Sequence, residues 1–416
     1  MNKRLILPED WSIVITGFLI ISLVILGFPL ISPNYSWRNI NELSENVFTN
    51  YNFKIALHLF ICLFSMAIFL AFISSKPLKP VLKSFPLVYL ITTFAMILAG
   101  NAFLKNWNLE AVIFSLSIGL VIRNFFKVPD WLKASLSTEA YVKIGLVLLG
   151  TTVIFGDILK AGSLGLIQAL IVVISVWYFA YWIARKLGVD EEMSIMISSA
   201  VSICGVSAAI ATAGAIKGDS KKLSYVISIV LITAIPMIVF LPILANFLGL
   251  NETVAGAWIG GTIDTSGGVI ASGTIIGEEA LKISTIVKFS QNVLLGLAAF
   301  AISIYWSYKG KLTETGEKAK PNVSVIWERF PKFVIGFIAA SFLFSFFIDA
   351  DTNNAVKGHL KAIQGLWFAL AFTSIGLETD FRELFNEQGK KPLYAFLTAQ
   401  LFNIAVTLLV AYLLFN

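Results

Sequence analysis

Long apolar runs separated by short polar segments make up most of the chain. A helix needs about 20 predominantly apolar residues to cross the hydrocarbon core of a bilayer. Thirteen runs come near that length: Trp11–Ile31, Ile55–Ile73, Phe85–Leu104, Leu109–Ile122, Ala140–Leu159, Leu164–Ala184, Ser194–Ile216, Leu223–Leu248, Val254–Ile276, Leu281–Trp306, Phe330–Ile348, Ile363–Leu377 and Pro392–Phe415. The pattern therefore predicts an all-α polytopic membrane protein with about 13 transmembrane helices.

Composition agrees with this prediction and excludes other classes of protein. Of the 416 residues, 57% are hydrophobic and 13% are charged, whereas soluble domains carry about 25% charged residues. The net charge of +6 does not indicate nucleic-acid binding, because the basic residues lie between apolar blocks. No nucleotide-binding, zinc-protease or hydrolase motif is present. We therefore expect no enzyme and no resident cofactor or metal; the expected partners are a small anion, membrane lipid and a second copy of the chain.

The positions of lysine and arginine predict the orientation. With Lys143 and Lys288 set aside because they lie inside spans, a cytoplasmic N-terminus places 19 basic residues inside and 10 outside. This asymmetry predicts a protein of the cell inner membrane with its C-terminus outside. The loop Lys217–Lys222 fits worst, since its three lysines fall outside unless the seventh span does not fully cross.

The order of the spans indicates internal symmetry. Spans four to eight and nine to thirteen form two sets of five, and the odd number of crossings between matching members would invert one set relative to the other. We expect repeat 1 over 109–250 and repeat 2 over 251–416, with a cytoplasmic linker at 307–329. Two extra helices in 1–84 and a leading helix in 85–108 precede the repeats.

Glycine follows small polar residues in the fourth span of each set. The two segments are Ser202-Ile203-Cys204-Gly205-Val206-Ser207 and Thr373-Ser374-Ile375-Gly376. Inverted repeats with interrupted helices are typical of secondary transporters, so we expect both spans to be broken and to cross near mid-membrane. The substrate would face Ser202, Cys204, Gly205, Ser207, Thr373, Ser374 and Gly376. Close helix packing through small residues is the alternative.

Charges inside apolar runs mark a second group of candidates. Asp264 lies among four glycines and three hydroxyl residues, in Gly260-Gly261-Thr262-Ile263-Asp264-Thr265-Ser266-Gly267-Gly268. Ionisable groups within spans are costly and usually functional. We assign ion coupling, by Na⁺ or H⁺, to Asp264, Thr265, Ser266 and Lys143, and assign Lys288 to the anion. A purely structural pairing of Asp264 with either lysine is the alternative.

Several of these segments resemble the YeiH-like family of bacterial inner-membrane proteins, which are labelled sulfate exporters. The similar motifs are Ser202-Ile203-Cys204-Gly205-Val206-Ser207-Ala208, Gly376-Leu377-Glu378-Thr379-Asp380, Lys143-Ile144-Gly145 and Val269-Ile270-Ala271-Ser272-Gly273. The resemblance covers about Phe85 to Phe415. It implies a fold of the bile-acid-symporter/antiporter type, with a panel domain, a core of crossed broken helices and a dimeric, elevator-like mode of transport.

The chain departs from that family at its central polar residues. Asp264, Thr265 and Gly268 stand where the family usually has a histidine, an acidic residue and a glutamine, and Gln291 replaces a family arginine. An inorganic-sulfate substrate therefore does not carry over by resemblance alone. We expect an ion-coupled secondary transporter of a small anion, either sulfate or an organic sulfonate or carboxylate. A cation/proton antiporter without organic substrate and an anion channel are the alternatives.

Overall fold

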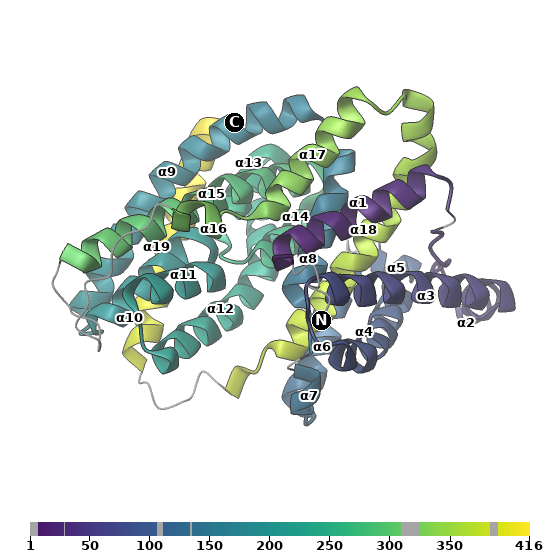
Figure 1. Ribbon diagram of the computed structural model, residues 1–416, viewed down its shortest axis with the longest axis horizontal. Coiled ribbons are helices and arrows are strands. Elements are labelled where there is room, and N and C mark those ends of the chain that lie inside the picture. Colours follow the sequence, from purple (N-terminus) through teal and green to yellow (C-terminus); the bar gives the residue numbers. More distant parts are fainter. Residues whose placement is uncertain (1–6, 29, 106–110, 134, 309–323, 383–389) are drawn as a thin grey trace, which may run out of the picture. The chain divides into compact units, whose positions relative to one another are not determined.

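The computed structural model describes residues 7–28, 30–105, 111–133, 135–308, 324–382 and 390–416 (Figure 1). All regular elements in these residues are helical, and β-type pairing among them is limited to one isolated bridge between Trp37 and Asn101. This confirms the all-α prediction. Among the described residues, seven helices are long and apolar enough to cross a membrane, and four shorter apolar helices have 10–17 residues. Most of the predicted linker 307–329 lies outside the described residues.

The chain divides into two compact units. Unit 1 comprises Met1–Gly156 and Lys332–Asp380, and unit 2 comprises Asp157–Pro331 and Phe381–Asn416. Both units therefore combine segments from distant parts of the chain, and neither coincides with one of the predicted repeats.

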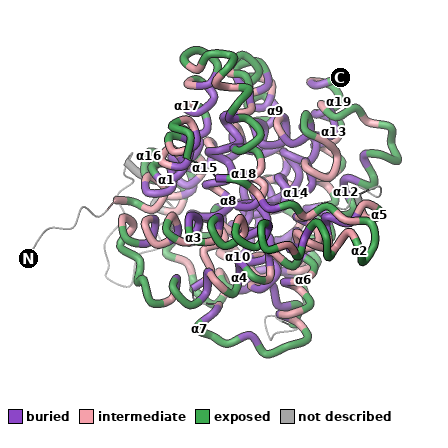
Figure 2. Tube along the Cα trace, turned by 90° about the vertical axis from the view of Figure 1, so that its right-hand side faces the viewer, coloured by how far each residue is buried: buried purple, intermediate pink, exposed green. Residues whose placement is uncertain are grey.

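Unit 1 is organised around one long helix, α18. The elements of this unit are α1 (Glu9–Ile25), α2 (Ile40–Glu42), η1 (Leu43–Val47), α3 (Asn50–Ile73), α4 (Leu78–Ala99), α5 (Ala102–Lys105), α6 (Ala111–Phe125), α7 (Asp130–Lys133), α8 (Thr138–Leu149), η2 (Gly150–Thr152), α17 (Lys332–Phe346) and α18 (Ala350–Glu378). α18 packs against α6, α8 and α4 and buries Trp367 and Phe372 completely. By contrast, α3 and α4 leave much of their apolar surface exposed (Figure 2), as expected of helices that face lipid.

α18 is continuous through Gly376, so the predicted interruption of span twelve is wrong. A Cβ atom on Gly376 would lie 2.5 Å from the carbonyl oxygen of Leu116 and 2.8 Å from the Cα of Gly119. The two glycines therefore let the backbones of α6 and α18 approach each other closely. Thr373 and Ser374 each donate a hydroxyl hydrogen bond to a carbonyl one turn earlier in α18, at 3.0 and 2.9 Å. At this segment the alternative reading, close packing through small residues, holds.

Unit 2 contains two short broken helical segments between long helices. Its elements are nearly all of α9 (Phe155–Lys186), then α10 (Glu191–Ser199), η3 (Ala200–Cys204), α11 (Val206–Ile216), α12 (Ser220–Phe247), α13 (Glu252–Thr262), α14 (Ser266–Ile276), α15 (Glu278–Tyr308), α16 (Ser324–Arg329) and α19 (Lys390–Phe415). α13 packs against α15 and α19, and α11 and α14 both pack against α15. The long helices α12, α15 and α19 thus enclose the broken segments.

α10, η3 and α11 form a helical hairpin, hairpin 1, rather than one crossing. Its beginning and its end lie side by side, because the carboxylate of Glu192 accepts a hydrogen bond from the backbone N–H of Asp219. The ammonium of Lys222 lies 2.9 Å from a carboxylate oxygen of Glu192 and strengthens the same closure. The predicted seventh span, Ser194–Ile216, therefore folds back on itself, and its interpretation as a crossing is wrong.

α13 and α14 form a second hairpin, hairpin 2, closed in the same way. The carboxylate of Glu252, the first residue of α13, accepts backbone hydrogen bonds from Glu279 and Ala280 at 3.1 and 3.3 Å. Those two residues begin α15, so the chain returns to the place where the hairpin began. The predicted ninth span, Val254–Ile276, also folds back.

The two hairpins enter unit 2 from opposite ends of α12. Hairpin 1 is closed at the N-terminus of α12, and hairpin 2 starts just after its C-terminus; the 28 residues of α12 separate the two ends by about 42 Å. The hairpin tips meet between these ends, since a Cβ atom on Gly205 would lie 3.1 Å from the Cβ of Asp264 and 2.7 Å from Val230 of α12. The fold therefore places Gly205 and Asp264 opposite each other.

Candidate functional site

The tip of hairpin 1 is a glycine turn. Gly205 has φ +61° and ψ −114°, close to the first central position of a type II′ turn, which glycine adopts without strain. This conformation ends η3 and lets α11 begin at Val206. The predicted break in span seven is confirmed at this residue.

The tip of hairpin 2 carries the buried carboxylate. Ile263, Asp264 and Thr265 lie between α13 and α14, and Asp264 is 1% exposed. The hydroxyl of Thr265 accepts a hydrogen bond from the backbone N–H of Gly268 at 3.1 Å, which caps α14. The glycine-rich run that predicted a poor helix around Asp264 thus forms the second tip.

Side chains of α15 donate hydrogen bonds to the end of the first arm of each hairpin. The first arm ends with η3 in hairpin 1 and with α13 in hairpin 2. The ammonium of Lys288 donates to the carbonyl of Ile203 at 2.7 Å and to the side-chain oxygen of Gln291 at 2.8 Å. Gln291 in turn donates to the carbonyl of Ser202 at 2.8 Å and to that of Gly261 at 3.2 Å. The last carbonyls of a helix have no partner within the helix, so these donors stabilise both tips away from water.

Two amides of α19 complete this set of donors. Gln400 donates to the carbonyl of Thr262 at 2.9 Å, and Asn403 donates to the carbonyls of Val201 and Thr262 at 3.1 and 3.2 Å. Gln400 and Asn403 are not among the residues predicted for the site from the sequence. Their spacing of three residues in an otherwise apolar run, which places both on one helix face, was the available signal.

The second arms present their N-termini at the tips. Gly205 provides no side-chain cap for α11, so its first N–H groups lack that partner. Ser207, in the first turn of α11, is exposed, and Thr265 and Ser266, at the start of α14, are half-buried, so each N-terminus carries at least one hydroxyl residue. Free N–H groups and the positive end of the helix dipole favour an anion.

Four buried oxygen atoms around the tip of hairpin 2 have no hydrogen-bond donor among the described residues. They are Thr262 Oγ1, Asp264 Oδ2, Asn292 Oδ1 and Gln400 Oε1. A buried polar atom left without a partner costs about 1–3 kcal/mol. Among the residues that the structure describes, Asp264 also forms no ion pair. The expected pairing of Asp264 with a lysine is thus not a direct ion pair among these residues, although the charge of Lys288 acts on Asp264.

The sequence-predicted site residues divide between the two units. Hairpin 1 carries Ser202, Cys204, Gly205 and Ser207, and hairpin 2 carries Asp264, Thr265 and Ser266; Lys288 bonds to hairpin 1. The hydroxyl of Ser202 is already used, since it donates to the carbonyl of Ser198 at 2.7 Å.

Lys143 and the three residues of α18 belong to unit 1. The ammonium of Lys143 lies 2.9 Å from a carboxylate oxygen of Asp10 and 3.2 Å from one of Glu139. Both carboxylates therefore pair with Lys143 within the unit. Thr373, Ser374 and Gly376 contribute to the packing of α18. Their predicted roles in coupling and binding remain predictions.

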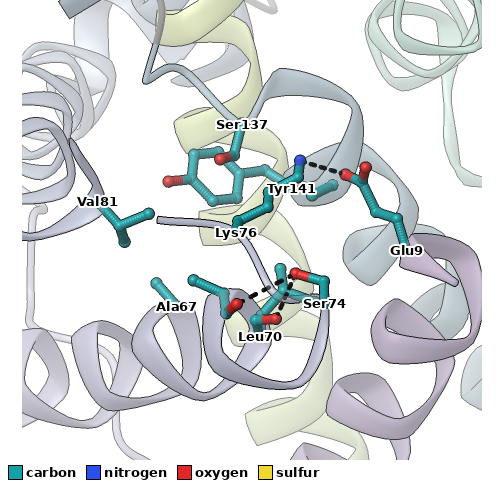
Figure 3. Close-up of a pocket in the computed structure, with 10 residues that line it drawn as sticks. Glu9, Ala67, Leu70, Ser74, Lys76, Val81, Ser137 and Tyr141 are labelled. Carbon is teal, nitrogen blue, oxygen red and sulfur yellow. Dashed lines mark hydrogen bonds and ion pairs between the residues drawn. The ribbon is translucent and has the colours of Figure 1, made fainter. Parts of the chain in front are cut away.

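A small pocket in unit 1 contains no residue of the predicted site. It lies beside the loop between α3 and α4, where Glu9 and Lys76 form an ion pair at 2.7 Å and Tyr141 forms part of the wall (Figure 3). Its two charged side chains neutralise each other, so the hairpin tips are the stronger candidate.

Comparisons with known proteins agree with a membrane protein. A family described as "Conserved hypothetical protein 698" matches residues 83–396, which include both hairpins. A UPF0324 membrane protein of Rhodopirellula baltica is 40% identical over 344 residues, covering 80% of this chain and 63% of the relative. Two UPF0324 membrane proteins of Nitratidesulfovibrio vulgaris are 36% and 35% identical over 340 residues, covering 79% of this chain and 58% of each relative. The chain thus spans about three fifths of the length of these relatives. No solved structure matches.

Proposed function

The chain belongs to the conserved hypothetical protein 698 family of membrane proteins, and from this premise we propose that it is an ion-coupled secondary transporter of a small anion. One observation carries the proposal: two helical hairpins meet tip to tip around the buried carboxylate of Asp264. The resemblance to the YeiH-like sulfate exporters supports the same class of function. The substrate class is sulfate or an organic sulfonate or carboxylate, moved across the inner membrane by an elevator-type homodimer.

The inverted repeat that we propose is shorter than the sequence predicted. Hairpin 1 with α12 and hairpin 2 with α15 are modules of the same construction, each with a carboxylate at its start that caps the next long helix. Because α12 leads from one hairpin base to the other, the second module is inverted relative to the first. The predicted boundary between 250 and 251 falls between these modules.

The dimensions of the hairpins suit a site at mid-membrane. α11, α13 and α14 have 11 residues each, or about 16 Å, which is half of the roughly 30 Å hydrocarbon core. Irregular backbone is tolerated at that depth only where protein or water satisfies it, and the donors from α15 and α19 meet this condition. In this scheme the N-termini of α11 and α14, with Ser207, Thr265 and Ser266, bind the anion, and Asp264 binds the coupling ion.

Because both hairpins fold back, the basic residues fit the predicted orientation better. Two fewer crossings leave the N-terminus inside and the C-terminus outside, but Lys217, Lys221 and Lys222 move to the inner side. The basic residues then divide into 22 inside and 7 outside.

We expect Lys221→Cys and Leu248→Cys to react with a membrane-impermeant maleimide from opposite sides, in a background with Cys62 and Cys204 replaced by serine. Lys221 is exposed near the base of hairpin 1, and Leu248 is exposed near the base of hairpin 2. Labelling in right-side-out and inverted vesicles measures the sidedness, with Lys221→Cys reacting only in inverted vesicles. Reaction of both cysteines from one side would contradict the inverted arrangement.

Asp264→Asn is expected to remove ion-dependent uptake while leaving the fold intact, because it keeps the shape of the side chain and deletes its charge. The measurement is uptake of labelled sulfate, a short sulfonate and a dicarboxylate into proteoliposomes under Na⁺ and H⁺ gradients. Asp157→Asn, at an exposed position in α9, is the matched control. Unchanged gradient dependence in Asp264→Asn would refute the coupling role.

The same proteoliposomes distinguish an anion carrier from an anion channel and from a cation/proton antiporter. A carrier shows saturation and counterflow of labelled anion against unlabelled anion, whereas an anion channel shows neither. A cation/proton antiporter, which the unpaired carboxylate of Asp264 also favours, would exchange Na⁺ for H⁺ with no anion present.

A further inference from the structure

We propose that the tip of hairpin 2 is a Na⁺ site whose ligands include Thr262 Oγ1, Asp264 Oδ2 and Asn292 Oδ1, with Gln400 Oε1 beside them. This inference rests on the proposed function, because it names the coupling ion of that site. The four residues are at most 5% exposed, and these four oxygen atoms have no donor among the described residues.

Each of the other three side chains belongs to, or contacts, a residue within two positions of Asp264. Thr262 is the last residue of α13, two positions before Asp264. The amide nitrogen of Asn292 donates to the hydroxyl of Ser266, two positions after Asp264, at 3.3 Å. The amide nitrogen of Gln400 donates to the carbonyl of Thr262 at 2.9 Å. In each amide the nitrogen is engaged, and the oxygen has no donor among the described residues.

A cation accounts for these oxygen atoms better than a proton does. Protonation of Asp264 would supply a single O–H donor, which can bond to only one of the oxygens of Asn292 and Gln400 and would leave the other without a donor. A single cation accepts several oxygen ligands at once, and broken helices in transporters coordinate Na⁺ with the ends of their half-helices. Asn, Gln and Thr oxygens together with one carboxylate are hard ligands of the kind that such ions prefer.

The charge at the tip favours a monovalent ion. Calcium and magnesium sites rely on carboxylates for charge, whereas the tip contributes one, and no group of three acidic or metal-binding side chains occurs in the part of the chain that the structure describes. The ammonium of Lys288, held at the tip of hairpin 1, adds a positive charge to the same region. With one carboxylate and one ammonium present, Na⁺ leaves one less uncompensated positive charge than a divalent ion does.

Thermal unfolding of the purified full-length protein in detergent tests the site without requiring transport. NaCl replaces choline chloride at constant ionic strength and pH, with KCl as a parallel series. We expect a saturable rise in melting temperature with Na⁺ and none with K⁺, since a ligand that binds only the folded state stabilises it. Thr262→Val and Asn292→Ala should each raise the half-saturating Na⁺ concentration about tenfold or more.

Thr285→Val is the matched control. Thr285 is as buried as Thr262, but its hydroxyl donates to the carbonyl of Leu281 within α15 at 2.7 Å. This variant should keep the wild-type response to Na⁺, whereas the same substitution at Thr262 should not. If Thr262→Val does not fold, the response of the melting temperature of Asn292→Ala to Na⁺ tests the site.

The outcomes separate this inference from the proposed function. Stabilisation by lower pH with no Na⁺ response overturns the Na⁺ site but is compatible with proton-coupled anion transport. A wild-type half-saturation in both Thr262→Val and Asn292→Ala also overturns it. A Na⁺ response that these variants weaken, in a protein that takes up no tested anion, supports the site and refutes the anion substrate.

Discussion

Gly205→Ala is expected to abolish transport and to destabilise the protein by about 3 kcal/mol or more. A side chain at φ +61° carries backbone strain of about 1–3 kcal/mol. The added Cβ would also lie 2.7 Å from Val230 and 3.1 Å from the Cβ of Asp264, inside van der Waals distance of both. Overpacking of this kind costs about 1–3 kcal/mol. Relief of the clash must separate the two hairpin tips, which removes the proposed site.

Gly249→Ala is the matched control for this effect. Gly249 also has a positive φ, +66°, but no heavy atom lies within 4 Å of its Cβ position. We expect a loss of about 1 kcal/mol with transport retained, as strain alone predicts. Uptake and melting temperature are measured on both variants. Equal losses in Gly205→Ala and Gly249→Ala would show that backbone strain, and not the contact between the hairpin tips, accounts for the effect of Gly205→Ala.

Lys288→Met is expected to be among the most destabilising changes in unit 2. Lys288 is 1% exposed, and its ammonium donates to Ile203 and Gln291. Methionine leaves the Ile203 carbonyl without that donor and removes a positive charge that acts on the buried carboxylate of Asp264. A buried oxygen left without its donor costs about 1–3 kcal/mol, and the loss of the buried positive charge adds to this cost.

The double variant Lys288→Met with Asp264→Asn should recover part of this loss, because it removes both charges. Denaturant or thermal unfolding of the two single variants and the double variant gives the coupling free energy between the sites. A coupling near zero would mean that the two charges do not interact, and that Lys288 acts only through its hydrogen bonds.

Local chemistry made several features predictable. Apolar runs predict helices in lipid, and a glycine after small polar residues predicted the break at Gly205. A single carboxylate among glycines and hydroxyls identified Asp264 before any fold was known. Each of these inferences depends on residues that are neighbours in the chain.

The sequence predicted helix breaks at both Gly205 and Gly376, and the prediction was wrong at Gly376. The error has a physical explanation. Gly376 and Gly205 follow similar residues, yet Gly376 lies in a continuous helix against Gly119, and Gly205 lies opposite Asp264. Glycine both permits close packing and permits a turn, so its presence alone does not distinguish the two.

The sequence by itself determined the all-α membrane class, the break at Gly205 and the unusual charge at Asp264, because these follow from residue type and local spacing. Only the tertiary structure decided that two apolar runs fold back instead of crossing, and that α15 and α19 provide the donors for their tips. A run that crosses and a run that returns have the same hydropathy. The difference lies in contacts such as Glu192 with Asp219, which join residues far apart in the chain.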